Sequence, residues 1–357
     1  MSQPVHAGVA RVVAGLASDQ VARGWQVTVA CPAQGWLPEA LTATGVDVVR
    51  WEATRSPGLS VVTETRSLSA LIRQVDPDVV HLHSAKAGLA GRLAVRGRRP
   101  TVFQPHAWSF DAVSGPVRRL SQEWERRASR WTHLTVCVSE AEAAAGRAVG
   151  VHGRLEVTPN GIDTARWPTG DRAASRARLG VPEAPTVVCV GRYARQKGQD
   201  LLVEAWRTVV AQVPGARLVF VGDGVDHPEL LAAAPAGVHV APNSDLADWY
   251  AAATVVAVPS RWEAGLPLVA MEAMSTARSV VAFDVAGIGS GLGDSGEAVP
   301  AEDTAALARA LVERLVDEPA ADAEGRTGRG RVFELFTATR SHADIARLTE
   351  ELLQLHR

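Results

Sequence analysis

The sequence predicts an α/β protein made of two doubly wound domains, each with a parallel sheet between layers of helices. Three observations carry this prediction. The chain has 357 residues, which suits two domains of about 150 residues each. Short Val-rich apolar runs recur along the chain in two successive series. Helical patterns separate these runs, as expected for βαβ units.

Each half of the chain contributes five apolar runs that we expect to form strands. In the first half they lie at 26–31, 46–51, 78–82, 101–105 and 133–138. In the second half they lie at 186–190, 217–221, 237–241, 254–258 and 279–283. The runs are continuous rather than alternating, which favours parallel strands buried on both faces.

The domain boundary is expected between residues 160 and 185. That region has no apolar strand, and it contains the turn signals Asn160-Gly161, Pro168, Gly170, Gly180 and Pro182. We therefore predict an N-terminal domain at 1–165 and a second domain at 166–335. A helical pattern at 336–357 is expected to return to the N-terminal domain.

The beginning of the chain departs from this scheme. A doubly wound domain usually opens with a strand that leads through a glycine turn into a helix. Here the helical pattern of 10–23 follows Met1 almost at once. The first strand is expected to be missing, which implies either a start of translation upstream of Met1 or a weakened N-terminal domain.

Composition and charge narrow the range of functions. Lys and Arg number 37 and Asp and Glu number 39, a formal net charge of −2, so no basic surplus exists for wrapping nucleic acid. The three cysteines lie in apolar runs, so we predict that they are reduced core residues rather than disulfides.

No apolar stretch reaches the roughly 18 residues of a membrane helix, and no signal peptide is apparent. We expect a cytoplasmic protein, with peripheral contact at the inner membrane face left open by the Arg- and Trp-rich helical pattern of 117–131.

The stretch Pro259–Met274 is the most informative motif. It follows the expected strand 254–258, so it lies at a strand's carboxyl end, where open α/β sheets bind ligands. A helix beginning near Gly265 and Leu266 would present its free N–H groups to a phosphate. Glu272 would lie roughly 9 Å farther along that helix, a distance that suits the ribose hydroxyls of the same nucleotide.

A second motif, Val190–Gly198, places two cations at another expected strand-to-helix turn. Arg192 and Lys197 follow the expected strand 186–190. Two cations beside a helix N-terminus can stabilise a diphosphate leaving group.

In the first half of the chain, His81 and His83 lie two residues apart in a strand and therefore point the same way. We expect them to be polar residues lining a cleft rather than metal ligands.

Together these motifs resemble those of the family-4 retaining glycosyltransferases. Gly191, Arg192, Lys197 and Gly198 match the family's G-R-x4-K-G stretch, and Glu263 and Glu272 resemble its E-x7-E motif. Further matches are Val138-Ser139-Glu140, Pro159-Asn160-Gly161, Val221-Gly222-Asp223-Gly224 and Pro259-Ser260-Arg261. The resemblance covers nearly the whole chain. It implies the GT-B fold, in which two Rossmann-like domains face each other across a cleft.

The resemblance also implies a role for each matching residue. Arg192 and Lys197 would bind the donor diphosphate, Glu263 the hydroxyls of the transferred sugar, and Glu272 the ribose. The backbone at Gly265 and Leu266 would contact the phosphates. His106, in Gln104-Pro105-His106, matches the histidine of the family's acceptor-side loop and would help to position the sugar. Gly8 matches the N-terminal glycine loop that approaches the phosphates.

Two departures from the family pattern bear on these roles. Eight residues rather than seven separate Glu263 from Glu272, and Ala7-Gly8 stands where the family often has Gly-Gly. The resemblance implies a retaining, metal-independent transfer of a sugar from a UDP- or GDP-sugar to a hydroxyl acceptor, in polysaccharide or glycolipid assembly. No cofactor is expected beside the donor substrate. The alternatives are a truncated, non-catalytic protein that binds nucleotide sugars, and a nucleotide-sugar epimerase on the same fold.

Overall fold

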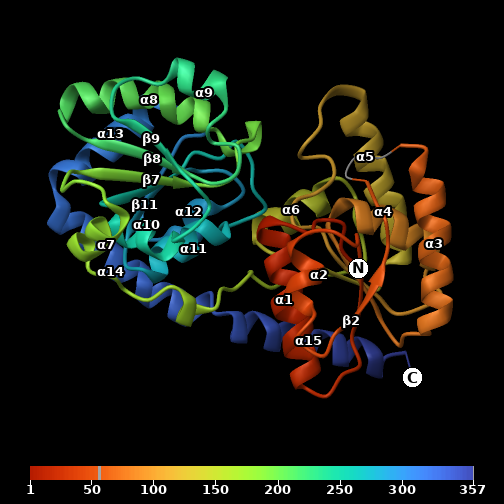
Figure 1. The fold of residues 1–357 in the computed structure, drawn as a ribbon. Coiled ribbons are helices and arrows are strands. Elements are labelled where there is room, and N and C mark those ends of the chain that lie inside the picture. Colours follow the sequence, from red (N-terminus) through yellow and green to blue (C-terminus); the bar gives the residue numbers. More distant parts are fainter. Residues whose placement is uncertain (55–57, 357) are drawn as a thin grey trace. The chain divides into compact units, whose positions relative to one another are not determined.

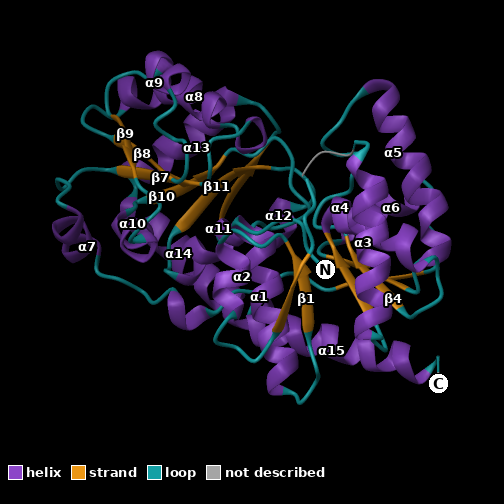
Figure 2. Ribbon diagram, turned by 45° about the vertical axis from the view of Figure 1, so that its right-hand side comes forward, coloured by secondary structure: helices purple, strands orange, loops and turns teal. Residues whose placement is uncertain are grey.

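The computed structural model describes residues 1–54 and 58–356, and these divide into two compact α/β units. Unit 1 comprises Met1–Asn160 and the C-terminal segment from Ala338, and unit 2 comprises Gly161–Thr337. The sequence analysis placed the boundaries after residues 165 and 335, whereas the contacts divide the chain after Asn160 and Thr337. Helices cover both faces of the sheets (Figure 2).

Unit 1 contains two short parallel sheets. One pairs β1 with β2, and the other has the order β3-β4-β5-β6. The strands are β1 (Thr28–Cys31), β2 (Asp47–Arg50), β3 (Val80–His83), β4 (Thr101–Gln104), β5 (Leu134–Cys137) and β6 (Arg154–Val157). The helices are α1 (Ala7–Ala22), α2 (Trp36–Leu41), α3 (Ser60–Val75), α4 (Ser84–Val95), α5 (Gly115–Ala128), η1 (Ser129–Trp131), α6 (Glu140–Ala148) and α15 (Ala338–Gln354).

The first two residues occupy the place of the strand that was expected to be missing. Ser2 forms a parallel bridge with His83, and its backbone N–H donates to Ala30 O at 3.0 Å. The N–H of His83 donates to Met1 O at 2.9 Å. A single residue thus joins β1 to β3, so the position is filled although no regular strand forms there.

Unit 2 is built on one parallel sheet of six strands in the order β12-β11-β10-β7-β8-β9. The strands are β7 (Thr186–Val190), β8 (Arg217–Val221), β9 (Val238–Ala241), β10 (Val255–Val258), β11 (Ser279–Phe283) and β12 (Gly296–Val299). The helices are η2 (Thr164–Arg166), α7 (Arg172–Leu179), η3 (Arg195–Lys197), α8 (Gln199–Gln212), α9 (Pro228–Ala233), α10 (Leu246–Ala252), α11 (Leu268–Ser275), α12 (Ile288–Leu292), α13 (Thr304–Val316) and α14 (Glu318–Leu335).

Two hydrophobic cores cover the two faces of the unit 2 sheet. Val187 and Cys189 belong to the core that contains α8, α9 and α13, whereas Val188 belongs to the core with α10, α11 and α14. Figure 1 shows these helix groups on opposite sides of the strands. Alternate residues of one continuous apolar strand therefore serve both cores, as expected for a parallel sheet between helix layers.

The two strands that the sequence analysis missed, β6 and β12, are edge strands. β6 reads RLEV and β12 reads GEAV, and most of their residues are only partly buried. An edge strand is covered less completely than a central one, so it carries polar residues and lacks the continuous apolar run that marked the others.

Candidate functional site

The strand order of unit 2 creates a place where the connections diverge. β7 lies between β8 and β10, so the chain leaves β7 toward one side of the sheet and later returns on the other side. Ligands of open α/β sheets bind at the carboxyl ends of the strands at such a switch point. The loop 191–198 after β7 and the loop 259–267 after β10 both emerge there.

Two glycines allow these loops to approach one another. Gly198 has φ +64°, and a Cβ placed on it would lie 2.0 Å from Pro259 O. Gly222, after β8, has φ +151°, and its Cβ would lie 2.4 Å from Gly191 O. A larger residue at either position would clash with backbone, so the glycines set the spacing of all three loops.

Two residues predicted for catalysis meet in this region. Lys197 Nζ lies 2.5 Å from Glu263 Oε1, and both side chains are largely buried. Gln199, the first residue of α8, supports the loop that carries Arg192, because its side-chain amide donates to Arg192 O at 3.0 Å. The structure therefore brings the β7 and β10 loops into direct side-chain contact, and it adds Gln199 as a support that sequence reasoning missed.

Arg261 makes the second connection between the two loops. Its guanidinium donates to both carboxylate oxygens of Asp200, at 2.8 and 2.6 Å, and to Arg195 O at 2.9 Å. Its backbone N–H donates to Gln196 O at 2.8 Å. The bidentate pair holds the pKa of the Asp200 carboxyl below its usual value. Arg261 was part of a matched motif, but its partners lie more than 60 residues away and could not be assigned from the sequence.

The helix after the second loop begins later than expected. α11 starts at Leu268 with Pro267 as its N-cap, whereas the sequence predicted a start near Leu266. The Leu266 side chain packs into the core of unit 2, and Gly265 is also buried. The expected contact of Leu266 with a ligand is therefore confined to its backbone.

Glu272 is buried in α11 rather than facing solvent. Its exposed fraction is 2%, and its Oε2 accepts a hydrogen bond of 2.7 Å from the Tyr250 hydroxyl on α10. A buried carboxylate needs hydrogen-bond donors, and Tyr250 supplies one. A carboxylate can accept more bonds than this. Tyr250 gave no signal in the sequence beyond its place in an apolar helix.

In unit 1, His106 lies in a strained loop after β4. His106 and the next residue, Ala107, have φ +52° and +91°, values that non-glycine residues seldom adopt. Glu142 on α6 holds the loop. One carboxylate oxygen accepts from Ala107 N at 2.8 Å, and the other accepts from Val138 N at 2.7 Å. Such strain persists only where the surroundings over-determine it, and Glu142 is a supporting residue that the sequence analysis missed.

His106 belongs to a group of three neighbouring histidines. Its Nε2 lies 3.1 Å from His83 Nδ1, and the His83 ring stacks on His81. Burial lowers the pKa of His106 to about 4 and that of His81 to about 3. The rings are therefore neutral near pH 7.

Polar atoms without well-aligned partners concentrate around these histidines. Five of the eleven such buried side-chain atoms in the described residues lie here: His81 Nε2, Ser84 Oγ, both Gln104 amide atoms and His106 Nδ1. Burial lowers the pKa of His81, but the Gln104 side chain is close enough to its ring to raise that pKa by hydrogen bonding. Buried polar groups normally find partners, so this set can bind a ligand that carries several hydroxyl groups. The expectation that His81 and His83 act as polar residues rather than metal ligands stays a prediction. The described part of the chain contains no group of three or more His, Cys, Asp or Glu arranged to hold a metal ion.

Gly8 lies in the first turn of α1, directly after a left-handed residue. Ala7 has φ +64°, a conformation that glycine adopts without penalty. Here an alanine adopts that conformation, and Gly8 itself is not among the left-handed glycines of the described residues. Gly8 and His106 belong to unit 1, and Arg192, Lys197, Glu263, Gly265, Leu266 and Glu272 belong to unit 2.

Family comparisons match both parts of the chain. Residues 6–166 match the model of "Glycosyltransferase Family 4", and residues 184–317 match "Glycosyl transferases group 1". A D-inositol 3-phosphate glycosyltransferase of Frankia alni is 31% identical over 79% of this chain and 72% of its own length. The same enzyme of Acidothermus cellulolyticus is 32% identical over 79% of the chain, but the chain spans only 65% of that relative. The lipopolysaccharide core mannosyltransferase LpsB of Rhizobium meliloti is 29% identical over 78% of the chain and 84% of its own length.

Solved structures share the fold over nearly the full chain. Anabaena HepE, crystallised with UDP and glucose, superposes with a TM-score of 0.83 at 21% identity and covers 98% of both chains. Sucrose-phosphate synthase of Thermosynechococcus elongatus gives a TM-score of 0.83 at 23% identity, over 98% of this chain and 94% of that one. Helices that could cross a bilayer are absent from the described residues.

Proposed function

The chain belongs to the family-4 glycosyltransferases of the GT-B fold, and from this premise we propose that it transfers a hexosyl group from a nucleotide-diphosphate sugar to a hydroxyl acceptor, with retention at the anomeric carbon. The observation that carries the proposal is the meeting of the 191–198 and 259–267 loops at the switch point of unit 2. Lys197 and Glu263 are in contact there, and Arg192 lies on the same loop as Lys197.

The role proposed for Arg192 and Lys197 follows from the negative charge that develops on the leaving diphosphate. The bond between the anomeric carbon and the diphosphate oxygen breaks, and the acceptor oxygen bonds to that carbon on the same face. The acceptor's proton leaves with the diphosphate. Arg192 and Lys197 stabilise the growing negative charge, which is the largest contribution that a preorganised site makes. These two cations supply that charge from the chain itself, so we propose that no metal ion or other cofactor takes part.

Lys197 exchanges partners when the donor binds. Without donor it is neutralised by Glu263 at 2.5 Å. A diphosphate is the stronger competitor because it brings more negative charge and more acceptor oxygens. Glu263 is then free to accept hydrogen bonds from the hydroxyls of the transferred sugar, and Glu272 to accept them from the ribose. The backbone of Gly265 and Leu266 contacts the phosphates, while Gly8 and His106 contribute from unit 1.

The names of the similar proteins guide the choice of substrates to test. HepE was crystallised with UDP-glucose, and LpsB is named a mannosyltransferase, so UDP- and GDP-sugars are the donors to compare. A saccharide or lipid-linked saccharide is the proposed acceptor, in polysaccharide or glycolipid synthesis.

The first two turns of α5 are exposed. Val117 is 57% accessible and Leu120 is 71% accessible, and both lie beside Arg118 and Arg119. This helix is the proposed point of peripheral contact with the inner membrane face, in a protein otherwise expected in the cytoplasm.

The decisive experiment combines nucleotide binding with turnover. Thermal unfolding is measured with UDP, GDP, ADP and NAD, each with magnesium and with a chelator, because a ligand of the native state raises Tm. We expect a chelator-resistant shift with UDP or GDP alone. Hydrolysis of the matching nucleotide sugar should fall about 100-fold or more in Arg192→Ala and in Lys197→Ala. Arg195→Ala on the same loop is the charge-matched control and should leave turnover nearly unchanged.

Each contrary result identifies a different error. Unchanged turnover in both variants would overturn the leaving-group assignment. Nucleotide binding without any transfer would favour a non-catalytic nucleotide-sugar-binding protein, and interconversion of the free nucleotide sugar would favour an epimerase.

A further inference from the structure

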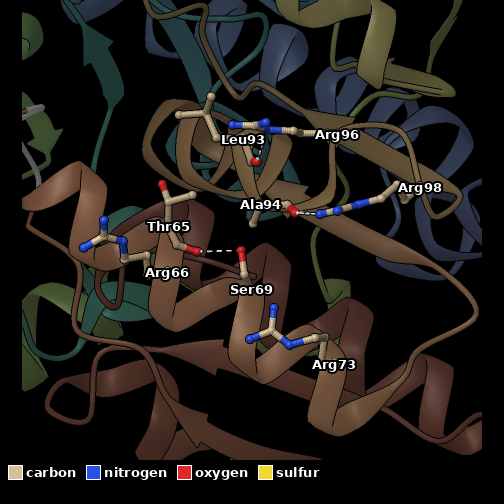
Figure 3. A pocket seen from close by; sticks show the side chains of 8 residues that line it. All are labelled: Thr65, Arg66, Ser69, Arg73, Leu93, Ala94, Arg96 and Arg98. Atoms are coloured by element: carbon tan, nitrogen blue, oxygen red, sulfur yellow. Dashed lines mark hydrogen bonds between the residues drawn. The ribbon is translucent and has the colours of Figure 1, made fainter.

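A cationic cavity of about 330 Å³ lies between α3 and α4 of unit 1, apart from the residues discussed above. Figure 3 shows the eight residues that line it: Thr65, Arg66, Ser69 and Arg73 on α3, Leu93 and Ala94 on α4, and Arg96 and Arg98 in the turn that follows. We call this the arginine cavity. Its volume falls within the range of small-ligand sites, and it is open to solvent, with all four arginines exposed.

The four arginines differ from the other cations of these helices in lacking acidic partners. Within the described residues, none of the four forms an ion pair with a carboxylate. The neighbouring cations do, in the pairs Lys86–Glu64, Arg92–Glu125 and Arg99–Asp76. The positive charge in the cavity is therefore not neutralised by the protein, although carboxylates neutralise it elsewhere on the same helix pair.

The sequence makes this charge imbalance local. Residues 60–100 contain seven Lys or Arg against three Asp or Glu, in a chain whose net charge is −2. The segments 65–75 and 84–100 contain no acidic residue at all. Like charges gathered at one concave surface raise the local potential and concentrate anions there.

Helix capping explains only part of the arrangement. Arg98 donates from Nε to Val95 O at 3.0 Å and from Nη2 to Ala94 O at 2.8 Å, and Arg96 donates to Leu93 O at 3.2 Å. Cations at a helix C-terminus are favourable there. A guanidinium carries five N–H donors, however, so these contacts hold the groups in place and leave donors unused. Arg66 lies near the middle of α3, where capping offers no reason for it.

The cavity is remote from the strand carboxyl ends of its own unit. α4 begins directly after β3, at the carboxyl ends of the strands, and its 12 residues span roughly 18 Å. Its last turn therefore lies toward the amino ends of the strands. Arg96 and Arg98 follow that last turn. A ligand held there would not compete with one held near His106.

We propose that the arginine cavity binds an anion with two linked phosphate groups, through guanidinium pairs that take phosphate oxygens in bidentate fashion. Guanidinium matches the geometry of phosphate oxygens, and four such groups fit a ligand of several negative charges better than a single carboxylate. The Ser69 hydroxyl, which donates to Thr65 O, can still accept a bond from a protonated phosphate. The diphosphate can come from a soluble metabolite or from a lipid headgroup.

Binding of inorganic pyrophosphate to the full chain tests this proposal by calorimetry. The variant is Arg66→Gln with Arg73→Gln. The matched control is Arg23→Gln with Arg50→Gln, two arginines of unit 1 that each pair with a carboxylate. We expect the cavity variant to bind pyrophosphate about tenfold more weakly or worse in one binding step, and the control to stay within about twofold. Equal affinity in the two double variants would overturn the proposal.

A second background separates this site from the proposed donor site. In Arg192→Ala, the pyrophosphate step that Arg66 and Arg73 support should persist, and loss of that same step would overturn the proposal. Vesicles of phosphatidylcholine, with and without diacylglycerol pyrophosphate, then distinguish the two sources. Loss of vesicle binding in the cavity variant as well as of pyrophosphate binding assigns a lipid headgroup, whereas loss of pyrophosphate binding alone assigns a soluble ligand.

Discussion

At the residue scale, Glu142 shows how one carboxylate can organise a loop that carries another residue's function. Its two oxygens accept from Ala107 N and Val138 N, and the Trp108 indole donates to Glu142 O at 2.7 Å. Burial raises the pKa of Glu142 to about 7. Glu142 touches no proposed reacting atom, so it is a positioning residue for the His106 loop.

Replacing Glu142 with Gln should loosen that loop. Gln retains one acceptor oxygen, so one backbone N–H then faces an amide donor, at a cost of about 1–3 kcal/mol in the free energy of unfolding. KM for the donor should rise as His106 shifts. Glu140→Gln, an exposed residue on the same helix, is the control and should change neither quantity. Unfolding curves and kinetics at two pH values measure both, and wild-type behaviour of Glu142→Gln would contradict the positioning role.

The buried histidines should make unit 1 sensitive to acid. His81 and His106 have pKa values of about 3 and about 4 in the folded chain, against an ordinary value of 6.5. Between about pH 6.5 and pH 4 the unfolded chain binds protons that the folded chain refuses, so stability falls as the pH drops through that window. Glu142 acts in the opposite sense, because its raised pKa lets the folded chain hold one more proton.

The variant His81→Gln tests this account by removing one of the groups. The slope of unfolding free energy against pH, between pH 4.5 and pH 6, should fall by about one proton, or about 1.4 kcal/mol per pH unit. A comparison at pH 8 measures the packing cost of the substitution alone. An unchanged slope would show that His81 is not buried as the structure has it.

At the element scale, the loops of unit 2 depend on glycines that let backbone meet backbone. Gly198 follows η3 and lies against Pro259 O. The turn after β7 can approach the turn after β10 this closely because Gly198 has no side chain. Arg261 and Gln196 then add hydrogen bonds between the same two loops, to Arg195 O and Trp262 O respectively. Rigid placement of both loops is what a preorganised site for a charged transition state requires.

Gly198→Ala should therefore cost more than its backbone angle explains. Gly180, at the C-terminus of α7, has nearly the same φ, +66°, and no heavy atom within 4 Å of a Cβ placed on it. Gly180→Ala should cost about 1 kcal/mol for the left-handed conformation, and Gly198→Ala should cost about 3 kcal/mol or more because the clash is added. Chemical denaturation of both variants gives the comparison. Equal costs would mean that the loops are not in close contact.

At the scale of the whole molecule, the C-terminal helix completes the unit in which the chain begins. Leu348 and Leu352 of α15 pack against Val102, Leu134 and Val136 of β4 and β5. Arg154 also pairs with Glu351 at 2.7 Å. The last segment of the sequence thus covers one face of the unit 1 sheet, after the chain has built all of unit 2.

Truncating Leu348 should destabilise unit 1 selectively. Leu348→Ala removes a buried side chain and should cost about 2–5 kcal/mol, whereas Leu355→Ala, at a position 74% exposed, should cost little. Hydrogen exchange followed by mass spectrometry should report the loss in the strands of unit 1. Equal loss of protection in unit 2 would show that the two units unfold together.

Much of the fold was accessible from the sequence because buried parallel strands carry their own signal. The ten predicted runs all overlap observed strands, and the comparisons with known proteins confirm the two-domain GT-B architecture. β6 and β12 escaped because edge strands are half exposed and need no apolar run. Met1 and Ser2 escaped because a one-residue bridge has no periodicity to detect.

The sequence by itself therefore determined the fold class, the family and the two motifs at the strand ends, since each depends on residues close together in the chain. Only the tertiary structure decided how those motifs are supported. Glu142 reaches Ala107 across 35 positions, and Tyr250 reaches Glu272 across 22. The arginine cavity is likewise formed by two helices, and neither helix by itself shows that its arginines lie close to those of the other. Contacts of this kind arise when packing brings distant segments together, and no local pattern of residues encodes them.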